Sequence, residues 1–421
     1  MLATSATFDL PASLFFSVPT RPMAHLGKLF LALATVSLLH AHFNLHLFDR
    51  PDAVDSADGS TTRKSLRVGH LPVTCHLTCP VTSWVSQHSS ERSEFVSWRY
   101  TSWPAMTEDI DAGNLDAAFI LAPLAMVMQR QGTPVKIVHL GHRDGTAIVV
   151  KKDSPYQTFE DLRGKRLAIP HRYSNQRILI EKLKDEFHFS NSEITLIDYP
   201  PPEMPAGLRS GQFEAYIVGE PFAAKAEVDG FGRVLYFTKD IWPNFISCVL
   251  VVTERLIERD PDIVRELVQG ISASGKWIDE GDQRLMAGLV EENSEDAGHA
   301  GATVIPEGFG RSPRMQAALI AARQEYYNQD PELLKFVLTR PIDRVSYSSL
   351  DLAEQDFAEI QDYAERLGFF SFRPVTEDDP FGFDDYCDPS FERSGTWELP
   401  LESDGDSTAG GPSTDRAEAL D

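Results

Sequence analysis

The sequence has few cysteines and few basic residues for its length. Four cysteines occur among 421 residues, too few for a disulfide-stabilised scaffold. Lysine and arginine number 39, against 63 aspartate and glutamate residues, which gives a formal net charge of -24. Nucleic-acid binders and proteins that adhere to anionic lipid need basic patches, so this imbalance argues against both classes.

The N-terminal part has no apolar run as long as the roughly 20 residues of a membrane-spanning helix. The run from Leu29 to Leu39 follows Lys28, and its length is typical of a secretory signal peptide, trimmed near Ala41. An uncleaved membrane anchor is the alternative, because "HAHF" gives no clear cleavage site, and a core helix is a third reading. We expect residues 1–64 to be a signal or anchor segment with a linker, and the protein to be periplasmic or otherwise extracytoplasmic.

The two ends of the chain enclose enough apolar sequence for two or three compact units. Hydrophobic residues make up 42% and aromatic residues 10% of the chain, and 421 residues exceed one typical domain. From Glu377 the chain becomes acidic and rich in glycine, serine and threonine. Such a composition buries little apolar surface, and it predicts an acidic disordered tail over residues 377–421.

The middle of the chain contains an internal repeat with a spacing of 98 residues. The stretches "GNLDAAFILAPLAM" and "GQFEAYIVGEPFAA" have the same order of glycine, acidic, apolar and proline residues. Four pairs of residues share this spacing: Pro72 and Pro170, Met106 and Met204, Gly113 and Gly211, Pro123 and Pro221. The repeat predicts two lobes built on one plan.

The local patterns predict alternating strands and helices in both lobes. Helices are expected at Ser174–Phe187 and Met204–Ser210, the second closed by Gly211. This alternation favours an α/β fold with mostly parallel sheets. Lobe 1 is expected over residues 65–150 and lobe 2 over 151–243, while residues 244–376 return to lobe 1 and add C-terminal helices. The expected strands are Leu66–Leu71, Phe95–Tyr100, Ala117–Leu121, Lys136–His139, Thr146–Lys151, Leu167–Pro170, Ile194–Tyr199 and Ala215–Val218.

Polar residues at the predicted strand ends identify a candidate cleft. Ligands of such sheets bind beyond the carboxyl ends of the strands. An unpaired carboxylate cannot stay in a core, so Glu220 is expected at the lip of this cleft. The candidate ligand-binding residues are Thr74, His76, Trp103, Ala122, Ser174, Asn175 and Glu220.

Three stretches resemble a known family. "PPPEMPAGLRSGQFEAYIVGEPFAAKAEVDGFGRVLYFTKDIWPN", "YTSWPAM" and "AAFILAPLAM" are similar to the nitrate and bicarbonate-type solute-binding proteins of ABC importers, relatives of the taurine and alkanesulfonate binders. The resemblance runs from about Leu66 to Glu280. It implies a two-lobed type II periplasmic-binding-protein fold with additional C-terminal helices, and a receptor rather than an enzyme. The implied partners are a small anionic solute and the ABC permease and ATPase subunits, with membrane contact only through the N-terminal segment or the permease.

Individual positions both follow and depart from the family pattern. Trp103 falls on the cleft tryptophan of the family's S-W motif, and Glu220 on the acid of V-G-E-P. Where nitrate and bicarbonate binders offer a histidine, this chain has Ser174, with His171 three residues earlier. The resemblance therefore implies the fold and the transport role and leaves the ligand open.

The residue types at the candidate cleft suit an oxyanion. Helix N-termini, hydroxyl groups and the indole N–H of Trp103 are neutral donors, and lysine and arginine are scarce at the predicted strand ends apart from Arg172. This favours a small, weakly charged ion such as nitrate or bicarbonate, with a sulfonate as runner-up. No cofactor is expected, although Glu220 could orient donors or hold a calcium ion beside the ligand.

Several of these residues also have simpler interpretations. Ser174 and Asn175 are suited to cap a helix, and Trp103 to fill a core. Cys75 and Cys79, with His76 between them, could bind a metal, form a strained disulfide or remain buried thiols. An enzyme related to the pyrimidine-precursor synthases, or a membrane-tethered sensor, is the alternative to a receptor, although no Gly-rich phosphate loop or nucleophile triad supports catalysis.

Overall fold

The computed structural model describes residues 64–89, 93–280, 312–347 and 349–392, which belong to one compact unit beginning at Arg63. The predicted signal or anchor segment lies outside the described residues, as does the tail from residue 393 onward. Within the described ranges, no helix combines the length and the apolar character needed to cross a bilayer.

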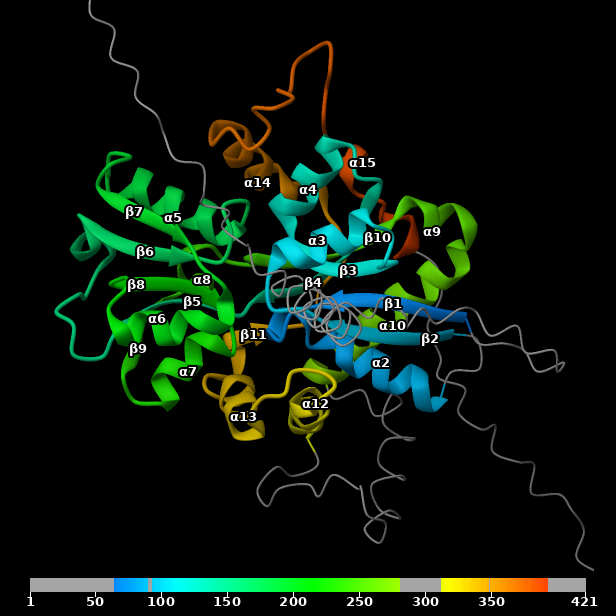
Figure 1. The fold of residues 1–421 in the computed structure, drawn as a ribbon, viewed down its shortest axis with the longest axis horizontal. Helices are drawn as coiled ribbons and strands as arrows, with labels where there is room; N and C mark the ends of the chain where they lie inside the picture. The colour runs from blue at the N-terminus through cyan, green and yellow to red at the C-terminus, as the bar shows by residue number, and fades with distance from the viewer. Residues whose placement is uncertain (1–63, 90–92, 281–311, 348, 393–421) are drawn as a thin grey trace, which may run out of the picture. The chain divides into compact units, whose positions relative to one another are not determined.

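The first of two sheets has six strands (Figure 1). β1 pairs in parallel with β2 and β3, whereas β10 pairs antiparallel with β3 and β4, and β11 pairs antiparallel with β4. Its strands in spatial order are β11 (Val345–Ser346), β4 (Val135–Asp144), β10 (Ile246–Thr253), β3 (Ala117–Leu121), β1 (Lys64–His70) and β2 (Ser93–Arg99).

The second sheet repeats the plan of the first. β6 pairs in parallel with β7 and β8, and β5 pairs antiparallel with β8 and β9. Its strands in spatial order are β7 (Ile194–Asp198), β6 (Lys165–Ile169), β8 (Ala215–Gly219), β5 (Thr146–Lys151) and β9 (Gly232–Phe237). The order β7-β6-β8-β5-β9 corresponds to β2-β1-β3-β10-β4, so the duplication inferred from the sequence is a duplication of sheet topology.

The sheets are mixed rather than mostly parallel, which corrects part of the expected α/β fold. The chain leaves the first sheet after β4, enters the second at β5, and returns through β10. Because β5 and β10 enter between strands that run the other way, they form the antiparallel pairs. Asp144 (φ 63°), Gly145 (φ 63°) and Asn244 (φ 61°) adopt left-handed backbone conformations at the two crossings.

The helices begin and end where local signals predict. Proline occupies the first turn of α4 and α6, and left-handed glycines follow both, Gly132 (φ 96°) and Gly211 (φ 79°). The lobes carry α2 (Thr78–Ser89), α3 (Trp103–Asp111), α4 (Ala122–Gln131), α5 (Asn175–Glu186), α6 (Met204–Ser210), α7 (Phe222–Val228) and α8 (Thr238–Ile241). The short 3-10 helices are η1 (Thr74–His76), η2 (Phe159–Leu162), η3 (Pro201–Glu203), η5 (Ile342–Arg344) and η6 (Pro389–Phe391).

The expected C-terminal helices are confirmed, and the ordered chain extends further than predicted. The helices are α9 (Glu254–Arg259), α10 (Pro261–Glu280), α12 (Pro313–Ala322), α13 (Pro331–Thr339), α14 (Glu354–Arg366) and α15 (Phe383–Tyr386). Residues 377–392, expected in the disordered tail, bury Phe381, Tyr386 and Phe391. A few aromatic side chains thus anchor an otherwise acidic and polar segment, which composition alone does not reveal.

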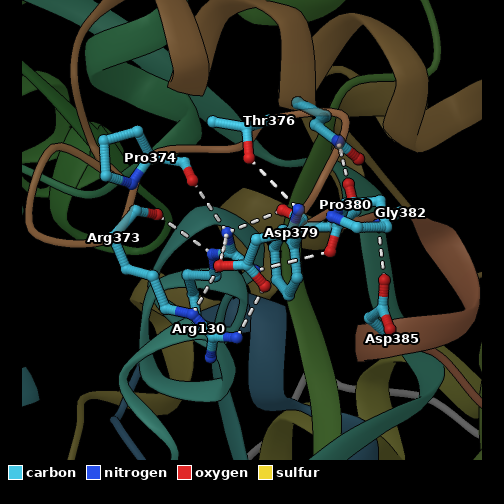
Figure 2. Close-up of polar contacts among 10 residues, drawn as sticks. Arg130, Arg373, Pro374, Thr376, Asp379, Pro380, Gly382 and Asp385 are labelled. Atoms are coloured by element: carbon cyan, nitrogen blue, oxygen red, sulfur yellow. Dashed lines mark hydrogen bonds and ion pairs between the residues drawn. The ribbon is translucent and has the colours of Figure 1, made fainter.

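One buried arginine of α4 fastens this C-terminal segment to the first lobe (Figure 2). Arg130 Nε donates to the carbonyl oxygen of Arg373 at 3.0 Å, and Nη2 donates to that of Pro374 at 2.9 Å. Nη2 also donates to the Asp379 carboxylate at 2.8 Å. The carbonyl groups of a segment without regular structure thereby obtain a strong donor inside the protein.

Candidate functional site

The candidate residues come together where the two lobes meet. They come from the loop after β1, the N-terminal turns of α3, α4 and α5, and the end of β8. The loops beyond the parallel strands of both sheets face this junction, as expected for an α/β fold. The seven residues Thr74, His76, Trp103, Ala122, Ser174, Asn175 and Glu220 are all at most 3% exposed.

Thr74 joins the lobes directly. Its backbone N–H donates to the carbonyl oxygen of Glu220 at 2.6 Å, and its hydroxyl donates to the same oxygen at 3.3 Å. The Tyr347 hydroxyl donates to the Thr74 carbonyl at 2.8 Å. A residue predicted to contact ligand therefore also connects β8 of lobe 2 to the first loop of lobe 1.

His76 is held as a neutral donor. The backbone N–H of Leu71 donates to its Nδ1 at 2.8 Å, so in the neutral ring the proton resides on Nε2. Burial lowers the pKa of His76 well below its usual value, which keeps the ring uncharged. Among the described residues Nε2 has no hydrogen-bond partner, so this N–H group is available to a ligand.

Trp103 provides a second available donor beside His76. The two rings meet edge to face with centroids 5.7 Å apart. Trp103 begins α3, and its Nε1 has no partner within the described part of the chain. The indole is therefore buried as a core residue would be, yet its polar group is unsatisfied, which is costly without a ligand or water.

The N-terminal turn of α5 contributes amides from lobe 2. Ser174 caps the helix, since its Oγ accepts from the Arg177 backbone N–H at 3.0 Å. The Asn175 side-chain N–H donates to the Ile246 carbonyl of β10, so its Oδ1 must be the acceptor end. That oxygen has no donor among the described residues. The capping interpretation of Ser174 is thus confirmed, while Asn175 bridges the lobes.

Ala122 offers no polar side chain to the junction. It is the first residue of α4 and is fully buried. Its contribution is limited to the backbone of a helix N-terminus. It corresponds in the repeat to Glu220, which makes the difference between the two positions informative.

Glu220 is buried rather than at the lip of a cleft, which corrects the prediction. Its side chain is 0% exposed and lies 3.2 Å from Arg344 Nε, measured to Oε1, while Oε2 accepts from the Ala224 backbone N–H at 2.8 Å. The sequence argument assumed no partner, but Arg344 of η5, which follows lobe 2 in the chain, provides one. Burial nevertheless raises the pKa of Glu220 to about 7, with Arg344 opposing the shift. A calcium ion beside the ligand remains an untested prediction.

Arg344 is a buried cation beside this carboxylate, and its Nε and Nη1 atoms have no hydrogen-bond partner among the described residues. Its guanidinium also contacts Glu227 of α7 and lies over the Phe237 ring, 4.8 Å from the centroid. The Arg172 side chain, noted in the sequence, is exposed and pairs with Asp198 at 3.3 Å. The described junction therefore holds neutral donors, His76 Nε2–H and Trp103 Nε1–H, and one buried guanidinium whose charge is balanced by Glu220 and Glu227.

A family assignment agrees with this geometry. A sequence model of the NMT1-like family matches residues 59–290 of the 421. The chain belongs to the NMT1-like family. This span includes both lobes and every candidate residue of the junction.

Curated relatives of this NMT1-like chain include much longer proteins. The nitrate import ATP-binding protein NrtC of Synechocystis sp. is 27% identical over 237 residues, which cover 51% of this chain and 35% of that protein. The NMT1-like chain therefore spans about a third of the length of this relative.

Solved structures establish the fold. The ligand-binding component of an ABC-type import system from Staphylococcus aureus, determined with zinc bound, has a TM-score of 0.64 at 22% identity, covering 79% of this chain and 100% of that chain. The periplasmic nitrate-binding protein NrtA from Synechocystis has a TM-score of 0.63 at 13% identity, covering 79% and 88%. The predicted two-lobed periplasmic-binding-protein fold is confirmed.

Ser247, whose hydroxyl group contacts three other side chains of the junction in this NMT1-like chain, was not identified from the sequence. The Ser247 hydroxyl lies 3.3 Å from Cys75 Sγ, 3.4 Å from Thr146 Oγ1 and 3.3 Å from Gln176 Nε2. Gln176 was detectable, because it follows Asn175 in the first turn of a predicted helix. Ser247 and Tyr347 carry no local signal, since their partners lie far away in the sequence.

The cysteines of the junction are not arranged as the sequence suggested. Cys79 lies 3.7 Å from Ser97 Oγ, and the four cysteines are free. Cys75 instead approaches Cys248 of β10. Burial, followed by the nearby Cys75, raises the pKa of Cys248 well above its usual value, so this thiol is protonated at neutral pH.

Proposed function

We propose that the chain is the extracytoplasmic solute receptor of an ABC importer and captures a small oxyanion between its lobes. The observation that carries the proposal is the pair of buried donors, His76 Nε2–H and Trp103 Nε1–H, without partners among the described residues. An anion satisfies such donors, whereas a cation would be repelled by them. The family, the fold and the nitrate-linked names of relatives support the same function.

The neutrality of the junction favours a weakly charged ion. The charge of Arg344 is balanced by Glu220 and Glu227, so an incoming anion would meet N–H groups and helix dipoles without a net positive charge, even though Arg344 Nη1 has no hydrogen-bond partner among the described residues. Desolvating a multiply charged ion without a paired cation costs far more than these donors return. Nitrate and bicarbonate fit this requirement better than sulfate or phosphate.

Asn175 favours bicarbonate over nitrate. Because its N–H group is committed to the Ile246 carbonyl, its buried Oδ1 can only accept a hydrogen bond. Bicarbonate carries an O–H group that can donate to this oxygen, whereas nitrate carries no hydrogen. Leaving a buried acceptor unsatisfied costs about 1–3 kcal/mol, so we expect bicarbonate to bind more tightly.

Calorimetric titration of the purified protein tests the proposal. The titrants are bicarbonate with and without calcium, nitrate, and taurine as the runner-up. Trp103→Phe keeps a buried ring and removes the donor, so it should weaken anion binding by about 1–2 kcal/mol. Trp277→Phe is the matched control, because Trp277 is equally buried with an unpartnered Nε1 in the described chain but lies in α10. Absence of binding by every titrant, or equal effects of both substitutions, would reject the site.

Export and assembly follow from the same proposal. The receptor would deliver its ion to a permease driven by an ATPase, and would lie outside the cytoplasmic membrane. Cell fractionation followed by N-terminal sequencing tests the location. Recovery of the full-length protein in the cytoplasmic fraction would contradict export.

A further inference from the structure

A pair of thiols lies within the junction, beside one of the proposed anion donors. Cys75 Sγ, Cys248 Sγ and a ring nitrogen of His76 all lie within 4.8 Å of one another, and the three residues are buried. Cys75 comes from the loop after β1 and Cys248 from β10, separated by most of both lobes in the sequence. The fold thus assembles a sulfur-rich group of donors that no local motif encodes.

The ring of His76 cannot serve as a metal ligand in its present hydrogen bonding. Its Nδ1 accepts from the Leu71 N–H at 2.8 Å, so its Nε2 bears a proton and has no lone pair to offer. A tetrahedral zinc site needs four ligands, and the described group supplies two sulfur atoms. The donor set therefore suits a cation that two thiolates satisfy.

We infer that Cys75 and Cys248 form a thiolate site for a soft monovalent cation, Cu(I). Soft sulfur ligands select Cu(I) over harder cations. Both sulfur atoms bind as thiolates, so any proton still on a thiol passes to solvent as its Cu–S bond forms, and the oxidation state of copper does not change. The site shares the His76 Nε2–H group with the proposed anion site, so the two proposals are tested by separate titrations.

Neighbouring groups are placed to stabilise the two thiolates. Ser247 Oγ lies 3.3 Å from Cys75 Sγ and can donate to it, and His76 offers its Nε2–H. His142 is paired in register with Cys248 across β4 and β10, which places both side chains on one face of the sheet. Both of its buried ring nitrogens lack a hydrogen-bond partner among the described residues. The ring N–H group of His142 is therefore free to donate a hydrogen bond to the thiolates.

Competition for Cu(I) tests this site. The reduced protein is titrated, without oxygen, against the coloured complex of Cu(I) with bathocuproine disulfonate. Cys75→Ser and Cys248→Ser should each lose Cu(I) binding, whereas the wild type should take up one equivalent. Cys79→Ser and Cys387→Ser are matched controls, because both residues are buried free cysteines outside the pair, and they should bind as the wild type does.

X-ray absorption tests the site in the wild-type protein and does not depend on whether a variant folds. X-ray absorption at the copper edge of the wild-type complex should show two sulfur ligands. The inference would be overturned if the wild type failed to compete for Cu(I), or if Cys75→Ser or Cys248→Ser bound Cu(I) as tightly as the wild type. A Zn(II) complex of the wild type as tight as its Cu(I) complex would overturn it too. Anion titration of the metal-free wild type is scored separately, so failure of one proposal is distinguishable from failure of the other.

Discussion

Each lobe binds a part of the chain that follows lobe 2 through a buried arginine. The arginine belongs to the lobe in one contact and to the later chain in the other. In lobe 1 the arginine belongs to the lobe: Arg130 of α4 donates to carbonyl groups and to Asp379 of the segment (Figure 2). In lobe 2 the carboxylates belong to the lobe, Glu220 and Glu227, and Arg344 comes from η5, which precedes the segment bound by Arg130. The corresponding regions of the duplicated fold, around α4 and around α7, therefore carry opposite charges in these two interactions.

The difference lies in where each arginine acts. Arg344 lies at the chain crossing, where its carbonyl accepts from the Gly145 N–H at 2.8 Å, and its partner Glu220 is also bonded to Thr74 of lobe 1. Arg130 of α4 donates hydrogen bonds to residues 373–380 and lies over the Phe381 ring, 5.1 Å from its centroid. We therefore expect the first arginine to affect both stability and ligand binding, and the second to affect stability alone.

The largest effect is expected from Arg344→Met. Removing the guanidinium leaves the Glu220 carboxylate buried without a countercharge, which typically costs about 3–5 kcal/mol. Urea unfolding followed by circular dichroism measures the loss, and bicarbonate affinity should fall as well. The double variant Arg344→Met/Glu220→Gln should recover part of the stability; additive losses would show that the ion pair is not the cause.

Arg130→Met should produce the next largest effect. Its loss leaves the carbonyl groups of Arg373 and Pro374 without this charged donor and removes one of the two arginines that bind Asp379, and we expect a cost of about 3 kcal/mol. The control is Arg373→Met, because Arg373 binds the same carboxylate from an exposed position, where an ion pair is worth at most about 1 kcal/mol. The comparison fails if Arg130→Met abolishes bicarbonate binding while the protein stays folded.

The buried partner of Arg344 should also make the stability of the protein depend on pH. Glu220 has a pKa raised from 4.5 to about 7 by burial, so the folded state binds its proton more tightly than the unfolded state does. Its contribution is present below about pH 4.5 and is lost as pH rises through 7. Urea unfolding of the wild type and of Glu220→Gln across this window should show a difference that changes with pH; parallel curves would refute the shift.

The smallest effect compares two helix caps, one in each lobe. Ser174 Oγ accepts from the Arg177 N–H, whereas Ser102 precedes α3 without a side-chain cap bond. Ser174→Ala should lower stability by about 1 kcal/mol, and Ser174→Gly by only a few tenths. Ser102→Ala should be neutral in thermal unfolding. Equal losses at both serines would contradict the assignment of the cap.

Particular elements show why sequence reasoning succeeded locally. β3, β5 and α6 have the predicted bounds, because apolar runs end at proline or glycine within a few residues. The 98-residue repeat predicted two similar lobes, and the sheets share one strand order. The candidate residues were found because loops after parallel strands converge by topology.

The failures all involve partners far apart in the chain. Glu220 was placed at a surface because Arg344 lies 124 residues later and carries no motif. The sheets were expected to be mostly parallel because the strand that returns as β10 cannot be recognised from its own pattern. Cys79 was the obvious partner of Cys75 by spacing, but the fold turns it toward Ser97 and brings Cys248 instead.

The sequence by itself determined the α/β elements, their duplication and the family, because hydrophobic periodicity, caps and turns depend on neighbours along the chain. The tertiary structure alone decided which charges are paired and which donors remain free. Arg344 neutralises Glu220, Leu71 sets the tautomer of His76, and Ile246 orients Asn175. Such choices depend on contacts across both lobes, where burial makes each unpaired charge or donor costly.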